Sequence, residues 1–329
     1  MRNQKESFGF SLCRAVQPSW GRTVVWGLAL TPLLLGPVFA CRDRPVVDMS
    51  QVTAEDGNGI PSDPRPALRI AVAARISPET TQVLYDALLD KVADRVGRRA
   101  VFSQRRTYAE VNAMLEGKEI ELAFVCAGPY TKGYEDFGME LLVVPLVRGK
   151  AVYHSYLLAG RDSPVQTFDD LRGRRFVFTD PDSNTGCLVP TFMLAERGET
   201  PGAFFSETFF TYSHDASIRA VADGHAAGAA GDSLVWDYCN ARDPVGTSRT
   251  RIIERSPPFG IPPVVVHPDL EPELKEALRE VFLGLHEDPV AAGLMRQLRI
   301  DRFTEGEDAA YDSVREMRRW IEESTGGLP

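Results

Sequence analysis

The stretch from Asp180 to Pro190 reads Asp-Pro-Asp-Ser-Asn-Thr-Gly-Cys-Leu-Val-Pro, and it separates an expected strand from an expected helix. The apolar run Arg175–Phe178 before it is typical of a short buried strand, and residues 188–197 after it are typical of a helix. A polar turn at a helix start aims several backbone N–H groups at one point, with the positive end of the helix behind them. This arrangement predicts a site for an anion.

Three small polar residues lie in the middle of this turn, Ser183, Asn184 and Thr185, and Gly186 follows them. Their side chains add hydroxyl and amide groups to the backbone donors of the predicted anion site. The same residue types are also common helix N-caps, so the alternative is that they only begin the helix. The stretch by itself leaves both interpretations open.

The bulk composition limits the classes of function. The chain has 329 residues, enough for one large domain or two lobes, and its hydrophobic content of 43% and charged content of 25% are those of a soluble globular protein. The net charge of −9 argues against a nucleic-acid partner. An anion site in such an acidic chain is expected to use local dipoles and hydrogen bonds, without requiring an Arg or a Lys.

Residues 1–40 are typical of a targeting segment, with basic residues first and an apolar core at residues 23–35 that is too short to span a membrane. Val38 and Ala40 precede Cys41 much as in the bacterial lipoprotein cleavage box. We therefore expect a lipoprotein signal peptide, lipidation of Cys41, and a protein anchored on the periplasmic or cell-surface face of a bacterial membrane. Plain secretion is the alternative, because Val38 and Ala40 also satisfy the ordinary cleavage rule.

Residues 41–66 are rich in Pro, Asp, Gly and Ser, which predicts a flexible tether between the anchor and the globular part. Three cysteines remain after it, Cys126, Cys187 and Cys239, so at most one internal disulfide is expected. Their spacing does not suggest a metal site, and we expect no cofactor.

From Ala67 onward, strand-like and helix-like segments alternate, which predicts an α/β protein. The expected strands are residues 68–73, 100–102, 120–125, 141–147, 152–159, 176–178, 204–211, 226–230 and 264–266. The expected helices are residues 78–96, 108–116, 188–197, 215–223, 233–240, 271–285, 289–298 and 308–323. Ligands of open α/β sheets bind beyond the carboxyl ends of strands, where we expect a turn at Gly128-Pro129-Tyr130.

Four motifs follow one another in this part of the chain. The strand that ends in Gly128-Pro129-Tyr130 is followed by Asp-Pro-x-Ser-x-Thr-Gly-x-x-x-Pro from Asp180, then Ser-His-Asp-x-x-x-x-Ala-Val-x-x-Gly from Ser213, then Asp-Ser-x-Val-Trp from Asp232. The ordered set resembles the phosphate/phosphite/phosphonate-binding proteins of ABC transporters, which are periplasmic solute-binding proteins with the two-lobed type II fold. The resemblance spans residues 67–320.

The resemblance implies a fold with two lobes, each a mostly parallel sheet flanked by helices. Residues 67–149 plus 258–329 would form lobe 1, and residues 150–257 would form lobe 2. The two lobes are expected to close on a ligand by a hinge motion.

The resemblance also implies contacts with the anionic headgroup of a ligand. Ser183 and Thr185 match family positions that hydrogen-bond this headgroup, and Asn184 replaces the usual hydroxyl residue between them. His214 matches the family histidine that contacts the same oxyanion, although a histidine here can also cap the helix that follows. Removal of the Thr185 hydroxyl is expected to weaken binding of the ligand.

Three further residues complete the implied site. Tyr108 and Tyr130 match aromatic wall positions on the facing lobe, and the alternative for each is a core or surface aromatic. Asp232 lies where an acidic residue often accepts from a protonated ligand oxygen or pairs with an amine, and the alternative is a helix cap. The family usually carries an aspartate where Ala227 stands, which leaves the identity of the oxyanion open.

The resemblance implies a monomeric solute-binding lipoprotein that delivers a phosphate, phosphite or phosphonate type of oxyanion to an ABC permease and its ATPase, and that is not an enzyme. One alternative is a ligand-sensing module of the same fold that signals to a membrane partner. Another is a thiol-based enzyme that uses Cys187. In the non-catalytic interpretation, Cys187 is a small core residue or pairs with Cys239.

Overall fold

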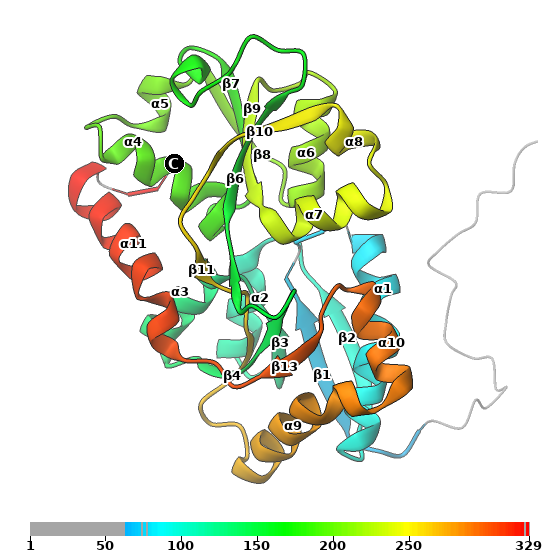
Figure 1. The fold of residues 1–329 in the computed structure, drawn as a ribbon. Helices are drawn as coiled ribbons and strands as arrows, with labels where there is room; N and C mark the ends of the chain where they lie inside the picture. The colour runs from blue at the N-terminus through cyan, green and yellow to red at the C-terminus, as the bar shows by residue number, and fades with distance from the viewer. Residues whose placement is uncertain (1–62, 74, 77, 326, 329) are drawn as a thin grey trace, which may run out of the picture. The chain divides into compact units, whose positions relative to one another are not determined.

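The computed structural model describes residues 63–73, 75–76, 78–325 and 327–328, and side chains 78–80 and 325 are left out of the description. The expected signal peptide and Cys41 lie outside the described residues, as does most of the expected tether. Pro61–Pro329 form one compact unit that contains two main β-sheets and a short two-stranded one. We call the six-stranded sheet with its helices the first lobe and the five-stranded sheet with its helices the second lobe (Figure 1).

The first lobe is built on a sheet with the strand order β13-β4-β12-β3-β1-β2. Its strands are β1 (Ala67–Val72), β2 (Arg99–Gln104), β3 (Leu122–Phe124), β4 (Glu140–Leu146), β12 (Val264–Val266) and β13 (Arg302–Thr304). The pairings of β1 with β2 and β3 are parallel, whereas β12 runs antiparallel to both β3 and β4. Strands β1 to β4 therefore share one direction, and the carboxyl ends of these four lie at one edge.

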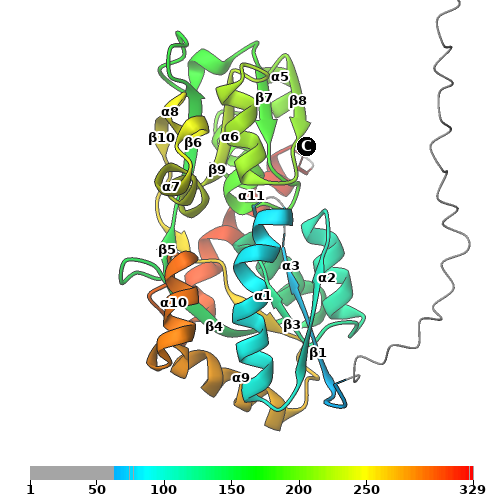
Figure 2. The ribbon, with the colours of Figure 1, turned by 90° about the vertical axis from the view of Figure 1, so that its right-hand side faces the viewer.

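Helices cover both faces of this sheet, and they are α1 (Pro78–Arg95), α2 (Tyr108–Glu116), α3 (Ala127–Phe137), α9 (Pro272–Gly284), α10 (Pro289–Gln297) and α11 (Asp312–Thr325). Along β1 the side chains alternate between faces: Leu68 and Ile70 pack with residues of α1, α9 and α10, whereas Ala71 packs with residues of α2, α3 and α11. Figure 2 shows α1 and α10 side by side on the first of these faces.

The second lobe is built on a sheet with the strand order β10-β6-β9-β7-β8. Its strands are β6 (Ser155–Gly160), β7 (Arg175–Phe178), β8 (Glu207–Phe210), β9 (Gly228–Asp232) and β10 (Thr250–Arg255), and its helices are α4 (Val189–Ala195), α5 (Pro201–Phe204), α6 (His214–Ala222), α7 (Ser233–Arg242) and α8 (Val245–Ser248). β7 pairs in parallel with β8 and β9, and β6 runs antiparallel to β9 and β10. Four of these five strands share one direction, and only β6 is reversed.

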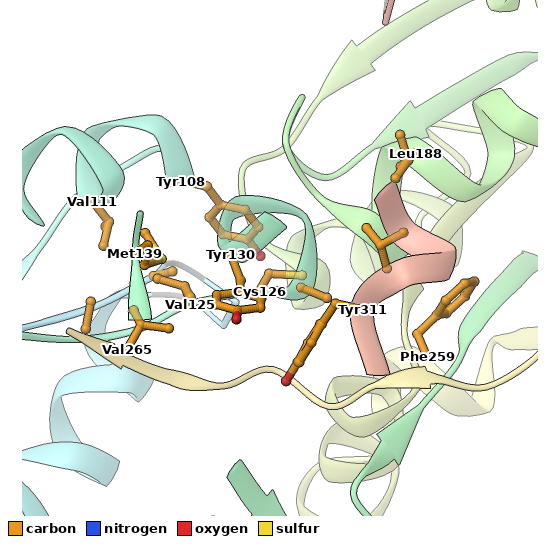
Figure 3. Close-up of a cluster of buried hydrophobic side chains, with 14 of the residues drawn as sticks. Tyr108, Val111, Val125, Cys126, Tyr130, Met139, Leu188, Phe259, Val265 and Tyr311 are labelled. Carbon is orange, nitrogen blue, oxygen red and sulfur yellow. The ribbon is translucent and has the colours of Figure 1, made fainter. Parts of the chain in front are cut away.

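Two crossover segments connect the lobes, and they pair with each other through β5 (Val152–Tyr153) and β11 (Phe259–Gly260) (Figure 1). Helix α11 contacts α3 of the first lobe and α4 of the second. A hydrophobic cluster joins residues of both lobes, with Tyr108, Cys126 and Tyr130 from the first and Leu188 from the second (Figure 3). One of the buried clusters thus spans both lobes.

The structure differs from the sequence expectations at several places, and it also contains α5, α8, β10 and β13, which were not expected. Gly128-Pro129-Tyr130 is not a turn but part of the first turns of α3, where a proline is tolerated because the first N–H groups of a helix have no intrahelical partner. Residues 152–159 are not one strand, because the chain leaves β5 and re-enters a different sheet at β6. The helix predicted from residue 188 is preceded by a π-helical turn, Asn184–Leu188. Within the described residues, no helix has both the length and the apolar character that a membrane crossing needs.

Candidate functional site

The carboxyl ends of strands from both lobes converge on one place. In the first lobe, Arg75 follows β1, Tyr108 begins α2 after β2, and Cys126 precedes α3 after β3. In the second lobe, Thr179 and the turn after it follow β7, His214 begins α6 after β8, and Asp232 ends β9. This convergence places the predicted residues of the second lobe opposite the end of the first sheet, as expected for a ligand site in an α/β fold.

The turn Ser183–Thr185 forms the start of a helix, as the sequence predicted. Ser183 is the N-cap, and its Oγ accepts a hydrogen bond from the backbone N–H of Gly186 at 3.0 Å. A Cβ at Gly186 would come within 2.4 Å of Thr179 Oγ1, so only glycine lets this turn pack so closely on the end of β7. The cap interpretation and the anion-site interpretation are therefore compatible, because one hydroxyl caps while others stay available.

Asn184 and Thr185 bring polar atoms into the buried centre of the turn. Asn184 Nδ2 donates to the hydroxyl of Tyr153 at 3.0 Å, and that hydroxyl lies 3.4 Å from Cys126 Sγ. The side chains of Asn184 and Thr185 are fully buried, yet Asn184 Oδ1 and Thr185 Oγ1 have no hydrogen-bond partner among the residues that the structure describes. Unpaired polar atoms are uncommon in protein interiors and often mark a place for a ligand or a water molecule.

His214 is held in one neutral form. Its Nδ1 accepts a hydrogen bond from the backbone N–H of Asp232 at 3.1 Å, which leaves the ring proton on Nε2. Nε2 lies 3.5 Å from the hydroxyl of Tyr108 on the facing lobe. Burial lowers the pKa of His214 to about 4, so the ring is uncharged at neutral pH. The neutral ring thus directs its Nε2 donor at the Tyr108 hydroxyl, at the junction of the two lobes.

Arg75 and Asp232 form an ion pair across the same junction. Arg75 Nη2 donates to Asp232 Oδ2 at 2.7 Å, and Asp232 Oδ1 accepts from the backbone N–H of Leu234 at 2.7 Å. Asp232 therefore caps α7, as its alternative interpretation predicted, and also neutralises Arg75. Burial alone would lower the pKa of Arg75, but the charge of Asp232 raises it above its ordinary value.

Arg75 is a site residue that was not predicted from the sequence, where neutral donors were expected to be sufficient. The available signal was its position, because Arg75 directly follows the first predicted strand, and ligands bind beyond such ends. What the sequence did not reveal was the partner, since Asp232 lies 157 residues further along the chain.

Further contacts between the lobes close over the turn. The backbone N–H of Tyr108 donates to Asp180 Oδ2 at 3.1 Å, and the backbone N–H of His214 donates to the carbonyl oxygen of Arg75 at 3.0 Å. Burial raises the pKa of Asp180 to about 6, although the hydrogen bonds that it accepts from the backbone N–H groups of Asp182 and Tyr108 act in the opposite direction. A Cβ at Gly128 would lie 2.1 Å from the carbonyl oxygen of Asp182, so the two backbones touch here.

The hydroxyl of Tyr130 points to Asp308 and not to the Ser183–Thr185 turn. Its hydroxyl donates to Asp308 Oδ1 at 2.6 Å, and its ring packs against Tyr311 with the centroids 4.7 Å apart. These partners belong to the C-terminal segment that leads into α11, not to the turn Ser183–Thr185. Six of the seven residues predicted to contact the ligand thus lie together at the junction of the lobes. The seventh, Tyr130, instead donates its hydroxyl hydrogen bond to Asp308.

The three cysteines that the structure describes do not form a disulfide with one another. Cys126, Cys187 and Cys239 are all free, so the suggested pairing of Cys187 with Cys239 is wrong. Cys187 is fully buried, and burial raises the pKa of its thiol far above the ordinary value, which disfavours the thiolate that a nucleophile needs. In the part of the chain that the structure describes, no cluster of His, Cys, Asp and Glu side chains is arranged to hold a metal ion.

Two sheets joined by paired crossovers, with polar groups buried where their strand ends meet, define the class of two-lobed periplasmic binding proteins. The solved structure of a binding protein component of an ABC phosphonate transporter from Pseudomonas aeruginosa shares this fold with a TM-score of 0.75. The alignment covers 79% of this chain and 88% of the Pseudomonas aeruginosa chain, with 19% sequence identity.

The chain belongs to the family described as ABC transporter, phosphonate, periplasmic substrate-binding protein, which matches residues 70–311. Among curated relatives, the phosphate-import protein PhnD of Mycolicibacterium smegmatis is 27% identical over 211 residues, 60% of this chain and 65% of the relative. The phosphonates-binding periplasmic protein of Escherichia coli is 23% identical over 173 residues, 51% of each chain. The matches thus span between half and two thirds of these relatives. The family consists of substrate-binding transport proteins rather than enzymes.

Proposed function

We propose that this protein is an extracytoplasmic solute-binding protein that binds a small oxyanion of the phosphate, phosphite or phosphonate type between its lobes. The bound ligand would then pass to an ABC permease driven by its ATPase. Membership of the phosphonate-binding family supports the transport role, and the names of the relatives support an oxyanion as the ligand. A signalling role for the same fold stays an alternative prediction.

The observation that carries this proposal is the hydroxyl of Thr185. The side chain is 0% exposed, and within the described part of the chain its Oγ1 has no hydrogen-bond partner. The hydroxyl lies in the first turn of a helix, where the positive end of the helix dipole favours negative charge. An oxyanion that accepts from Thr185 would supply the missing partner with a charge-assisted hydrogen bond.

The remaining donors support the same role. His214 offers a proton on Nε2 while its ring is neutral, and Tyr108 offers its hydroxyl from the facing lobe. The hydroxyl of Ser183 is occupied by the cap, so we assign it a positioning role unless the cap bond is exchanged on binding. Asp232 would approach the ligand only after release from Arg75, or through the ligand's own cationic group.

Access to the turn requires the lobes to part, because Ser183, Asn184 and Thr185 are fully covered. We propose a hinge at the paired crossovers β5 and β11, which are the short connections between the lobes. The proposed lobe bounds are residues 67–149 plus 258–329 and residues 150–257. These bounds are supported by the strands, since the two main sheets divide between the two sets.

We also propose that the chain is a monomeric lipoprotein, attached to the membrane through Cys41 and a tether at residues 41–66. The support for this anchor is the sequence Val-Phe-Ala-Cys at residues 38–41 after an apolar core. The family description as periplasmic supports a location outside the cytoplasmic membrane.

Calorimetry of the unit Pro61–Pro329 with phosphate, phosphite and methylphosphonate tests the oxyanion proposal. Thr185→Val removes only the unpaired hydroxyl, and we expect it to weaken binding by about 1.5–3 kcal/mol if that hydroxyl donates to a charged ligand. Thr247→Val is the matched control, because Thr247 of α8 is also buried but its hydroxyl donates to Asn240 of α7, outside the Ser183–Thr185 turn. Equal affinities of Thr185→Val and the unaltered protein would remove Thr185 from the site.

A further inference from the structure

A separate cavity of about 80 Å³ opens beside Arg75, between α1, the end of β4 and the start of α7. Figure 2 shows the first turn of α1 reaching from the first lobe toward the second. Most of the cavity wall is apolar, with contributions from both lobes that include Val72, Leu84, Phe124, Leu234, Val235 and Phe303. None of Ser183, Asn184 and Thr185 belongs to this wall. The cavity is therefore distinct from the turn proposed to bind the oxyanion.

The charged groups of the cavity are predominantly positive. Arg75, Arg148 and Arg299 line it together with one acidic residue, Asp237. Arg148 pairs with Asp237 at 3.0 Å and is 64% exposed, whereas the side chain of Arg75 is 21% exposed. Arg75 thus lies at the deep end of the cavity, and Arg148 lies at its open end. Asp232 balances the charge of Arg75 and Asp237 that of Arg148, so the net positive charge of the chamber comes from Arg299. A positive charge beside an apolar wall favours an anion that carries a hydrocarbon group.

Arg75 has a donor left over for such an anion. Its Nε and Nη2 both point to Asp232 Oδ2, at 3.2 and 2.7 Å. A guanidinium has five N–H donors, and among the described residues no hydrogen-bond acceptor is found for Nη1 of Arg75. An acid group can therefore accept a hydrogen bond from Nη1 of Arg75 while the ion pair with Asp232 stays intact. The carboxylate of Asp232 then keeps its positive counter-charge.

We propose that this cavity binds an organic acid, with the acid group at Nη1 of Arg75 and a short hydrocarbon substituent against the apolar wall. A water needs about 10–15 Å³ of such space, so 80 Å³ holds on the order of six water-sized groups. The substituent is therefore a chain or ring of a few carbons. The shared chemistry is a monoanionic acid head, which either a carboxylate or an alkylphosphonate supplies.

Titration of the unit Pro61–Pro329 with straight-chain carboxylates from acetate to octanoate tests this proposal, and a matched series of alkylphosphonates distinguishes the two acid heads. We expect Kd to fall about fourfold for each added methylene until the cavity is filled, as expected for burial of hydrocarbon. Inorganic phosphate, which has no substituent, serves as the probe of the Ser183–Thr185 turn. A Kd that does not change with chain length in either series overturns the proposal.

Leu234→Phe reduces the cavity without changing a charged group, because Leu234 is a partly buried wall residue whose contact with Asp232 is made by its backbone. We expect it to weaken hexanoate binding at least tenfold and to leave phosphate binding within twofold. Val290→Phe also introduces a phenyl ring, at an exposed position of α10 outside the wall, and should change neither affinity. Thermal unfolding monitors the fold of both variants, and a folded Leu234→Phe protein with unchanged hexanoate affinity overturns the proposal.

Thr185→Val separates this proposal from the oxyanion proposal. We expect it to weaken phosphate and to leave hexanoate within twofold, since Thr185 does not line the cavity. Loss of both ligands to the same extent would place the acid head at the turn and overturn the assignment to Arg75. Absence of phosphate binding, with the chain-length dependence intact, would contradict the oxyanion proposal and support the cavity.

Discussion

The guanidinium of Arg75 donates two hydrogen bonds to a single carboxylate oxygen of Asp232, and this ion pair links the two lobes. Arg75 follows β1 in the first lobe, and Asp232 is the last residue of β9 in the second. The side chain of Asp232 is 0% exposed, so its charge has little compensation other than Arg75 and the N–H of Leu234. A buried charge with one cationic partner makes the junction sensitive to changes at either residue.

Arg75→Met is expected to lower the free energy of unfolding by about 3–5 kcal/mol, because it leaves the carboxylate of Asp232 buried without its counter-charge. The double variant Arg75→Met/Asp232→Asn should lose less, since asparagine is neutral and its Oδ1 still accepts from the N–H of Leu234. Urea unfolding of the two variants measures the difference. Equal losses in both would show that the charge of Asp232 is not what the pairing stabilises.

The pH dependence of stability should reveal opposing contributions from Asp180 and His214. Burial raises the pKa of Asp180 to about 6, so the folded state binds this proton more strongly, and stability from it is lost as pH rises from about 4 to about 6. Burial lowers the pKa of His214 to about 4, so the unfolded state binds that proton more strongly, and stability is lost as pH falls from about 6.5 to about 4.

The two contributions can be separated by removing one group at a time. His214→Asn retains an acceptor for the N–H of Asp232, and its free energy of unfolding should decline by on the order of 2 kcal/mol between pH 4 and 6. Asp180→Asn should show the opposite trend, with stability increasing over this interval. Urea unfolding across a pH series provides the measurement, and parallel profiles for the two variants would contradict the assignment.

Gly128→Ala is expected to prevent the close contact between the lobes. Its Cβ would meet the carbonyl oxygen of Asp182 at 2.1 Å, and a backbone atom cannot move aside as a flexible side chain would. We expect at least tenfold weaker oxyanion binding and a larger radius of gyration in solution scattering. Gly202→Ala is the control, since nothing lies within 4 Å of an added Cβ there. Unchanged scattering and affinity in Gly128→Ala would argue against closure at this contact.

The three thiols of the unit Pro61–Pro329 should react in an order set by their burial. Cys239 is partly exposed, whereas Cys126 and Cys187 are buried, so maleimide should label Cys239 first. The other two should react at the rate of global unfolding. Peptide mapping by mass spectrometry follows each site, and rapid labelling of Cys187 in the folded protein would revive the thiol-enzyme alternative.

Cys41→Ser is expected to abolish incorporation of palmitate in cells and to move the protein from the membrane fraction to the soluble extracytoplasmic fraction. The physical reason is that the sulfur of Cys41 is the proposed attachment point of the lipid, and a single hydroxyl does not substitute for it. A lipid-labelled Cys41→Ser protein would contradict the anchor, and an unlabelled unaltered protein would favour plain secretion.

Local signals in the sequence determined the alternation of strands and helices and the ordered motifs, because apolar periodicity and turn residues act over a few neighbours. The strand Arg175–Phe178 and the helix Tyr108–Glu116 appear as predicted, and the family expected from the motifs matches residues 70–311. The sequence also located the turn Ser183–Thr185, since its polar residues and glycine are adjacent in the chain.

Only the tertiary structure decided which distant residues meet. Arg75 finds Asp232 through the pairing of two lobes, Tyr130 turns to Asp308 because the C-terminal segment packs on α3, and the apolar cavity exists only between elements of both lobes. Such contacts depend on how sheets pack together rather than on any local pattern. The sequence therefore shows that Arg75 follows a predicted strand. It does not show that Asp232 is the partner that balances the charge of Arg75.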